Sequence, residues 1–157
     1  TPYLYYQIST SYYSWQIGRA AKQFEQDYLN FLKQDTYGGK TPQETYELYV
    51  DALKKGDIDL AVRYYYWEKQ EQEKERLMKL KEQGKFEDYV NSLPKWEEMK
   101  EEEYWNPEMK MYNWEKFSEE EKVYDPLINK EIIFPAGIYE ASLIFWFNQH
   151  AGIWKLY

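Results

Sequence analysis

The chain has 157 residues, with 28 acidic and 20 basic side chains, so its formal net charge at pH 7 is −8. This charge opposes binding to phosphate backbones and anionic membrane surfaces, and nucleic acid is therefore not an expected partner. The absence of cysteine excludes disulfides, thiolate nucleophiles and thiolate metal sites. The length suits one compact unit with its own core, and aromatic residues, at 20% of the chain, supply much of that core's bulk.

Residues 1–40 are expected to form a lead-in and one long helix. The first ten residues carry tyrosines without a clear period, which favours an irregular segment. From Ser11 to Gln34 the apolar residues recur at spacings of four and three, so they share one stripe of a helix. We expect Gly38 and Gly39 to end that helix. The stripe residues are Tyr13, Ile17, Ala20, Phe24, Tyr28 and Phe31.

Two short helices with clear start and stop signals follow. Thr41 is an N-cap residue, Pro42 suits the first helical position, and Glu44 completes the spacing of a capping box. Gly56 supplies a left-handed stop and Asp57 caps the second helix. The apolar residues of both helices recur with helical spacing, so the pair must cover an apolar surface.

Residues 68–105 are expected to form a highly charged helical insert. Glu68 to Gln83 is predicted to form a helix that carries several favourable acidic-to-basic pairs. A second helix begins at Phe86, and Pro94 either kinks it or opens a new helix that runs to about Tyr104. In the charged helix we expect only three side chains to be buried: Leu77, Met78 and Leu80.

The period changes from helix to strand after Pro107. Met109 to Phe117 is compatible with a strand that points Tyr112 and Trp114 to one side, although Ser118 and Glu121 also have the spacing of a helix cap.

The last thirty residues complete an antiparallel sheet. Ile132–Phe134 is a short strand, and Ile138–Phe147 alternates as a half-buried strand does. The connection Asn148–Gly152 joins it to Ile153–Tyr157 in a hairpin. Helices first and strands last predict an α+β fold, with N-terminal helices packed on a C-terminal curved antiparallel sheet.

Two segments carry a resemblance to a known superfamily. TPQETYELYVDALKKGDIDLAVRYY at Thr41–Tyr65 and the closing NQHAGIWKLY resemble the NTF2-like (cystatin-like α+β cone) superfamily. The likeness covers about 25 residues at Thr41–Tyr65 and about 20 at Tyr139–Tyr157. It implies an NTF2-like domain over residues 41–157, with the helical insert near the mouth of the cone. Fold alone does not give function, because this superfamily hosts enzymes, carriers and assembly modules.

A second likeness bears on location. Gly38-Gly39-Lys40-Thr41-Pro42 is similar to the GG-[KD]-TPEET-type helix of uncharacterised, membrane-anchored bacterial envelope proteins. It implies an extracytoplasmic, cell-envelope domain. No stretch reaches the roughly 18 apolar residues of a membrane span, so any attachment is expected through an anchor outside this chain.

Candidate chemistry is sparse. His150 is the sole histidine, so no His pair can hold a metal, and in a predicted turn it is most simply a solvated residue. It is still the first candidate for acid–base work, because only His titrates near neutrality. Asp57 and Asp59 are explained by helix capping. The glutamate clusters lack the glycine turn of a calcium loop. No metal or other cofactor is expected.

Aromatic residues are the better candidates for binding. Four consecutive rings, Tyr64 to Trp67, point in all directions on a helix and cannot all enter one core. The candidate ligand-binding residues are Tyr65, Tyr66, Trp67, Tyr139, Phe145, Trp146 and His150.

Three functions compete. The leading hypothesis is a non-enzymatic binding or assembly domain, because no nucleophile with a base, metal set or phosphate loop is recognisable. The second is a carrier or enzyme for a small molecule held in the cone pocket, with His150 or a carboxylate acting on it. The third is recognition of glycan or peptide by exposed aromatics. A homodimer through Trp146 and Trp154 is a further option.

Overall fold

The computed structural model describes the backbone of residues 2–125 and 129–157, and the side chains of residues 17–120, 122 and 129–157. The chain divides into two compact units. The N-terminal unit comprises Thr1–Thr36 and Asn148–Gly152, and the α+β unit comprises Tyr37–Phe147 and Ile153–Tyr157.

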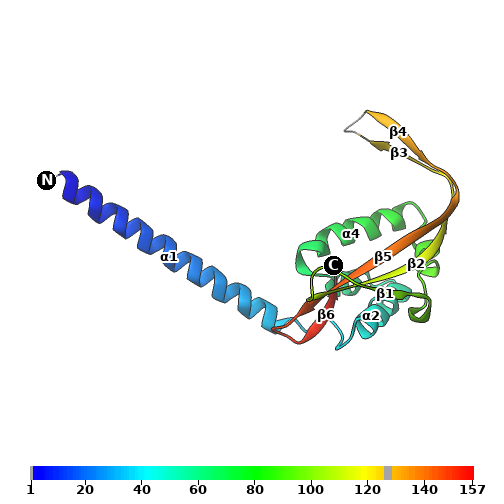
Figure 1. The fold of residues 1–157 in the computed structure, drawn as a ribbon, viewed down its shortest axis with the longest axis horizontal. Coiled ribbons are helices and arrows are strands. Elements are labelled where there is room, and N and C mark those ends of the chain that lie inside the picture. Colours follow the sequence, from blue (N-terminus) through cyan, green and yellow to red (C-terminus); the bar gives the residue numbers. More distant parts are fainter. Residues whose placement is uncertain (1, 126–128) are drawn as a thin grey trace. The chain divides into compact units, whose positions relative to one another are not determined.

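The N-terminal unit is built on helix α1, Pro2–Gln34, which is 33 residues long (Figure 1). Asn148 Nδ2 donates a buried 2.8 Å hydrogen bond to the carbonyl of Leu32, and Asn148 Oδ1 accepts from the backbone N–H of His150. The expected irregular lead-in is wrong, because a proline is tolerated in the first turn and the helix begins there. The predicted helix end at about Gln34 is confirmed, although the glycine pair that was expected to stop the helix lies beyond that end.

The α2–α3 pair confirms the capping predictions. Helix α2 spans Pro42–Lys54 and α3 spans Ile58–Arg63. Thr41 Oγ1 accepts from the Glu44 N–H at 3.1 Å, Asp57 Oδ1 accepts from the Leu60 N–H at 2.9 Å, and Gly56 has φ +72°. One detail differs: the Glu44 carboxylate accepts from the N–H of Lys40, not of Thr41.

The sheet of the α+β unit has the strand order β1-β2-β5-β6 and is antiparallel. A separate two-stranded hairpin, β3-β4, continues the β2-β5 hairpin beyond the sheet (Figure 1). The α+β prediction is confirmed. The strands are β1 Lys100–Glu102, β2 Met109–Ser118, β3 Glu121–Asp125, β4 Lys130–Phe134, β5 Gly137–Asn148 and β6 Ile153–Leu156.

The predicted insert is helical only in its first half. Helix α4, Trp67–Glu82, confirms the charged helix, and α5 is short, Phe86–Asn91. The expected helix to about Tyr104 is wrong, because only a 3-10 turn, η1 at Trp96–Glu98, follows Pro94 before strand β1 begins. The alternative helical turn after Ser118 is also wrong, because β3 lies there.

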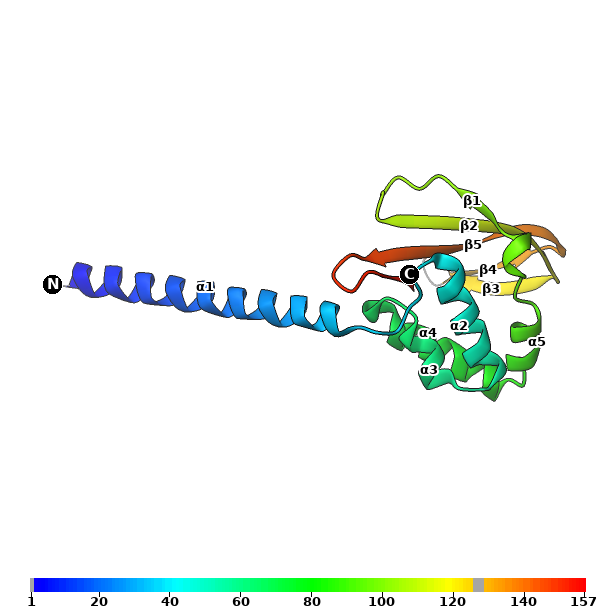
Figure 2. The same cartoon turned by 90° about the horizontal axis from the view of Figure 1, so that it is seen from below.

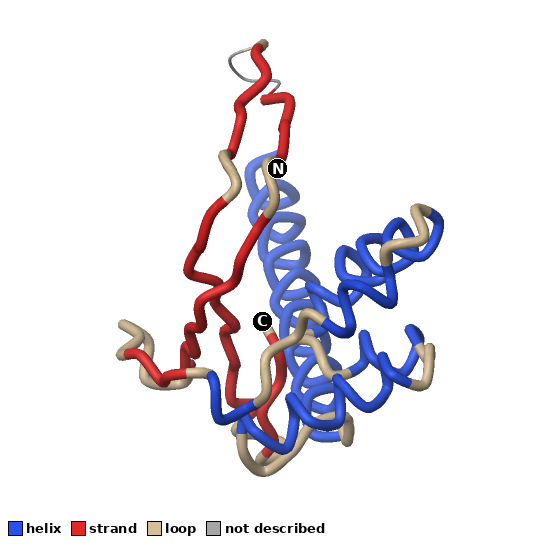
Figure 3. The backbone as a smooth tube through the Cα atoms, turned by 90° about the vertical axis from the view of Figure 1, so that its right-hand side faces the viewer, coloured by secondary structure: helices blue, strands red, loops and turns tan. Residues whose placement is uncertain are grey.

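Helices α2 to α5 lie together on one side of the strands (Figures 2 and 3). Phe145 is 0% exposed at the centre of the sheet, where its ring meets Tyr112 edge-on at 5.6 Å. Trp96 of η1 closes over both rings, 4.6 Å from Tyr112, and Tyr46 of α2 lies 6.0 Å from Trp96. Aromatic side chains therefore fill the space between helices and sheet at this point.

A buried polar network joins α4 to the core. Glu73 is 6% exposed and accepts from the Tyr49 hydroxyl at 2.8 Å and from Arg76 through two 2.8 Å bonds. Tyr89 contacts Arg76 Nη2 at 2.8 Å and the Tyr49 hydroxyl at 3.1 Å. Burial raises the pKa of the Tyr49 hydroxyl, so it stays protonated and can donate.

The side-chain burial predicted for α4 is only partly confirmed. Leu77 is fully buried as expected, but Met78 is 43% exposed and Leu80 is only half-buried. The burial of Glu73 was not predicted, because a glutamate in a charged helix gives no sign of its buried partners.

The glycine pair serves a close backbone approach instead of a helix end. The Gly39 N–H donates to Thr45 Oγ1 at 2.8 Å, and Thr45 Oγ1 donates to the Trp154 carbonyl at 2.9 Å. Thr45 is 0% exposed. A Cβ atom at Gly39 would lie 2.7 Å from the Thr45 nitrogen, which leaves no room for a side chain.

We predict that Glu73→Ala lowers the free energy of unfolding by about 2 kcal/mol. The substitution leaves the buried Tyr49 hydroxyl without its acceptor and removes the charge-assisted hydrogen bonds from Arg76. Urea denaturation followed by circular dichroism measures this change. The control is Glu75→Ala, an exposed position on the same helix, which should change it by less than about 0.5 kcal/mol. Equal effects of the two substitutions would contradict the prediction.

We predict that Gly39→Ala lowers the free energy of unfolding by about 1–3 kcal/mol, as overpacking does in a close contact. The same denaturation experiment tests it. Gly18→Ala is the matched control, because a Cβ there meets nothing within 4 Å and alanine favours the α1 helix. A Gly39→Ala protein as stable as the parent would refute the close approach.

Candidate functional site

The β2–β5 ladder has a helix side and an outer side. Tyr112 and Trp114 of β2 point to the same side, as predicted, and both pack on the helix-side core. Because side chains alternate along a strand, the residues between them face outward. The outward pairs, each one residue of β2 opposite one of β5, are Met109 and Trp146, Met111 and Ile144, Asn113 and Ser142, Glu115 and Glu140, and Phe117 and Ile138. We call these ten residues the outer face.

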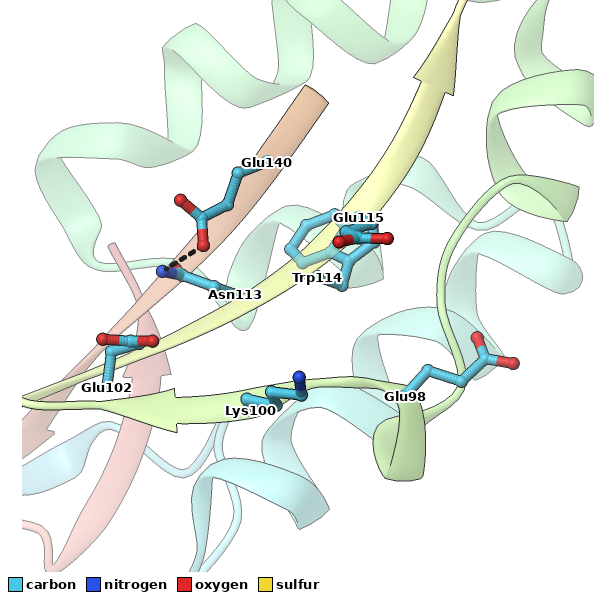
Figure 4. Close-up of a pocket in the computed structure, with 7 residues that line it drawn as sticks. All are labelled: Glu98, Lys100, Glu102, Asn113, Trp114, Glu115 and Glu140. Carbon is cyan, nitrogen blue, oxygen red and sulfur yellow. Dashed lines mark hydrogen bonds between the residues drawn. The ribbon is translucent and has the colours of Figure 1, made fainter. Parts of the chain in front are cut away.

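The middle of the outer face opens into a cavity of about 410 Å³, which we call the acidic groove (Figure 4). Four carboxylates surround it against one ammonium group, so its charge attracts cations. Glu115 and Glu140 lie directly opposite in the ladder, and like charges so placed destabilise a sheet. The residues that line the groove are Glu98, Lys100, Glu102, Asn113, Trp114, Glu115 and Glu140.

Two groups of the groove have hydrogen-bonding capacity left over. Asn113 Nδ2 donates to Glu140 at 3.2 Å, but Asn113 Oδ1 and Trp114 Nε1 are buried and have no hydrogen-bond partner among the described residues. A buried polar atom without a partner costs about 1–3 kcal/mol. Asn113 faces the groove, so its Oδ1 is an acceptor for a bound molecule, whereas Trp114 packs its ring on the helix side and only borders the groove.

Glu101, on strand β1, is a glutamate of this sheet whose carboxylate is held by hydrogen bonds from neighbouring side chains. It accepts from Lys110 Nζ at 2.8 Å and from the Tyr112 hydroxyl at 2.9 Å. The hydrogen bond from Lys110 holds the pKa of Glu101 below its usual value. By contrast, the only described side-chain hydrogen bond to a groove carboxylate across the ladder is the longer one from Asn113.

An aromatic cluster forms a second candidate site. The ring of Tyr66 lies 4.8 Å from Trp146, 5.5 Å from Tyr157 and 5.9 Å from Trp67. Trp67 is 39% exposed and Tyr157 is 44% exposed, and Lys69 Nζ lies 5.1 Å above the Tyr157 ring. Three of the predicted binding residues thus meet, together with Tyr157, which the sequence analysis missed although it closes the predicted hairpin.

Three of the other four predicted residues lie elsewhere in the α+β unit, and the fourth, His150, belongs to the N-terminal unit. Tyr65 meets Tyr49 edge-on at 5.5 Å, and its burial raises its pKa. Phe145 is in the core, and Tyr139 donates to the Pro135 carbonyl at 2.5 Å on the extended hairpin. His150 is exposed in the turn of the N-terminal unit. The six predicted residues of the α+β unit therefore do not form one site.

No three His, Asp or Glu side chains that could hold a metal ion are grouped in the part of the chain whose side chains are described. Within residues 2–125 and 129–157, no helix is both long enough and apolar enough to cross a membrane. Comparisons of the chain with protein-family models, with curated proteins and with solved structures find no match.

Proposed function

We propose that the protein is a non-enzymatic binding domain that recognises an extended, basic peptide segment at the acidic groove. The observation that carries this proposal is the opposed pair Glu115 and Glu140 beside two polar atoms that lack partners. A Lys or Arg side chain between the two carboxylates would relieve their repulsion. Asn113 Oδ1, which faces the groove, suits an N–H group of a peptide backbone.

The outer face also indicates what flanks the basic residue. Phe117 and Ile138 form an exposed pair, 65% and 70% exposed, two residues along the strands from Glu115 and Glu140. Two strand residues span about 7 Å, which is also the spacing of alternate residues in an extended peptide. The preferred ligand therefore has an apolar side chain two residues from its basic one.

Glycan or peptide recognition by the aromatic cluster is a second candidate, favoured by the exposure of Trp67 and Tyr157. The cone-pocket carrier or enzyme has less support. Phe145 is enclosed by other side chains, and the buried carboxylate of Glu73 is bonded to Arg76 and Tyr49. The NTF2-like relationship and the extracytoplasmic, envelope-associated location stay proposals that rest on the sequence resemblance.

We predict that the double variant Glu115→Gln/Glu140→Gln weakens peptide binding by about tenfold, because it removes both carboxylates that face the ligand's cation. The probe is a fluorescein-labelled peptide of alternating glycine with Lys and Phe in turn, and fluorescence anisotropy at low ionic strength measures its affinity. Added salt should weaken binding to the parent more than to the variant.

The matched control is Glu68→Gln/Glu71→Gln, which removes the same charge from exposed positions of α4. It should leave the affinity within about twofold of the parent. Equal weakening in both variants would show that only net charge matters, and a parent protein that does not bind would reject the proposal.

A further inference from the structure

A cavity of about 490 Å³ is lined by the last turn of α2, the last turn of α4 and by α5. Its floor is apolar. The side chains of Leu53 and Val90 are buried there, at 1% and 8% exposed, and Phe86 packs half-buried against the same core. Because these side chains belong to the packed core, the floor is formed before any ligand arrives. The volume falls in the range of sites that hold small molecules.

Three lysines line this cavity: Lys54 and Lys55 at the end of α2, and Lys81 in the last turn of α4. A cation near the C-terminus of a helix interacts favourably with the helix dipole, which explains a lysine at each helix end separately. Because the two helices end beside one cavity, their lysines converge, and we call it the lysine pocket. Glu87 is the one acidic residue among the described residues that line it, so the lining is net positive in a chain whose net charge is −8.

Two of the three ammonium groups are available to a ligand. Lys55 Nζ is held by the carboxylate of Asp51 at 2.5 Å, and Asp51 does not line the pocket. Lys54 Nζ and Lys81 Nζ form no hydrogen bond or ion pair within the described part of the chain. The side-chain amide of Asn91, which also lines the pocket, has no hydrogen-bond partner among the described residues either. Its Nδ2 therefore adds a third donor.

We propose that the lysine pocket binds a small amphipathic anion, with its apolar body on Phe86 and its carboxylate, sulfonate or phosphate group paired with Lys54 and Lys81. An ammonium group and an anionic oxygen form a charge-assisted hydrogen bond, which is stronger than a bond to a neutral acceptor. A bare inorganic anion would leave the apolar floor uncovered, and a neutral apolar molecule would leave both lysines unpaired. The ligand therefore needs both parts. This inference is independent of the acidic groove, which takes a ligand of the opposite charge.

Fluorescence titration of the whole chain with anilinonaphthalene sulfonate, which has an aromatic body and one sulfonate, tests the pocket. We expect Lys54→Gln/Lys81→Gln to raise the dissociation constant about tenfold, because it removes both cations that pair with the sulfonate. Both lysines are exposed, so the double variant should fold as the parent does. The control Lys79→Gln/Lys116→Gln removes the same charge from exposed positions outside the pocket and should change the affinity less than about twofold. Equal weakening in both variants, or a parent that does not bind, would overturn the proposal.

A neutral probe and a map of the contact site complete the test. Phenylnaphthylamine keeps the aromatic body and lacks the sulfonate, so it should bind the parent more weakly and should not distinguish the parent from the lysine variant. Equal affinity of the two probes would contradict a role for the lysines. In a nitrogen–proton NMR titration with the sulfonate, the backbone N–H of Gly56 and the side-chain amide of Asn91 should shift, because both residues line the pocket. Shifts centred instead on the aromatic cluster around Tyr66 would refute the lysine pocket as the site.

Discussion

The architecture of the α+β unit depends on how the outer edge of strand β6 is closed. Trp154 donates its N–H to the carbonyl of Gly39 at 2.8 Å, and Leu156 pairs with the segment just after α3, donating to Tyr64 and accepting from Tyr66. The chain before α2 and the chain after α3 thus hold the same strand, so the helix pair is fixed to the sheet at both ends. An open sheet edge invites pairing with other chains, and this closure removes that hazard at β6. It also commits the helices to one side of the sheet.

The helix pair was predictable because its signals are local. The caps at Thr41 and Asp57 depend on residues three positions away, and the structure confirms both. Features that depend on distant partners were not predictable. Glu73 is buried only because Tyr49, 24 residues earlier, donates to it, and no spacing rule reveals such a bond. Gly39 was taken for a helix stop because its hydrogen bond from Trp154 comes from a strand more than a hundred residues later.

The residues of the candidate sites also differ in whether the sequence alone could predict them. Consecutive rings that cannot share one core pointed to Tyr66 and Trp67, and Trp146 was named among the candidate aromatic residues. The structure brings these three together. The acidic groove was missed. Its central pair, Glu115 and Glu140, exists only once the register of β2 on β5 is known, and a glutamate in either strand alone reads as a solvated residue. With one side of the sheet filled by the core, the outer face is the surface on which a binding function is most directly supported.

The most direct test of the binding account is a nitrogen–proton NMR titration of the whole chain with the basic peptide. The account predicts that the Asn113 side-chain amide shifts first, because it gains a partner in the groove. Signals of the Tyr66 and Trp146 region should move less. If the shifts instead centre on the aromatic cluster or spread over the acidic helix α4, the groove is not the binding site.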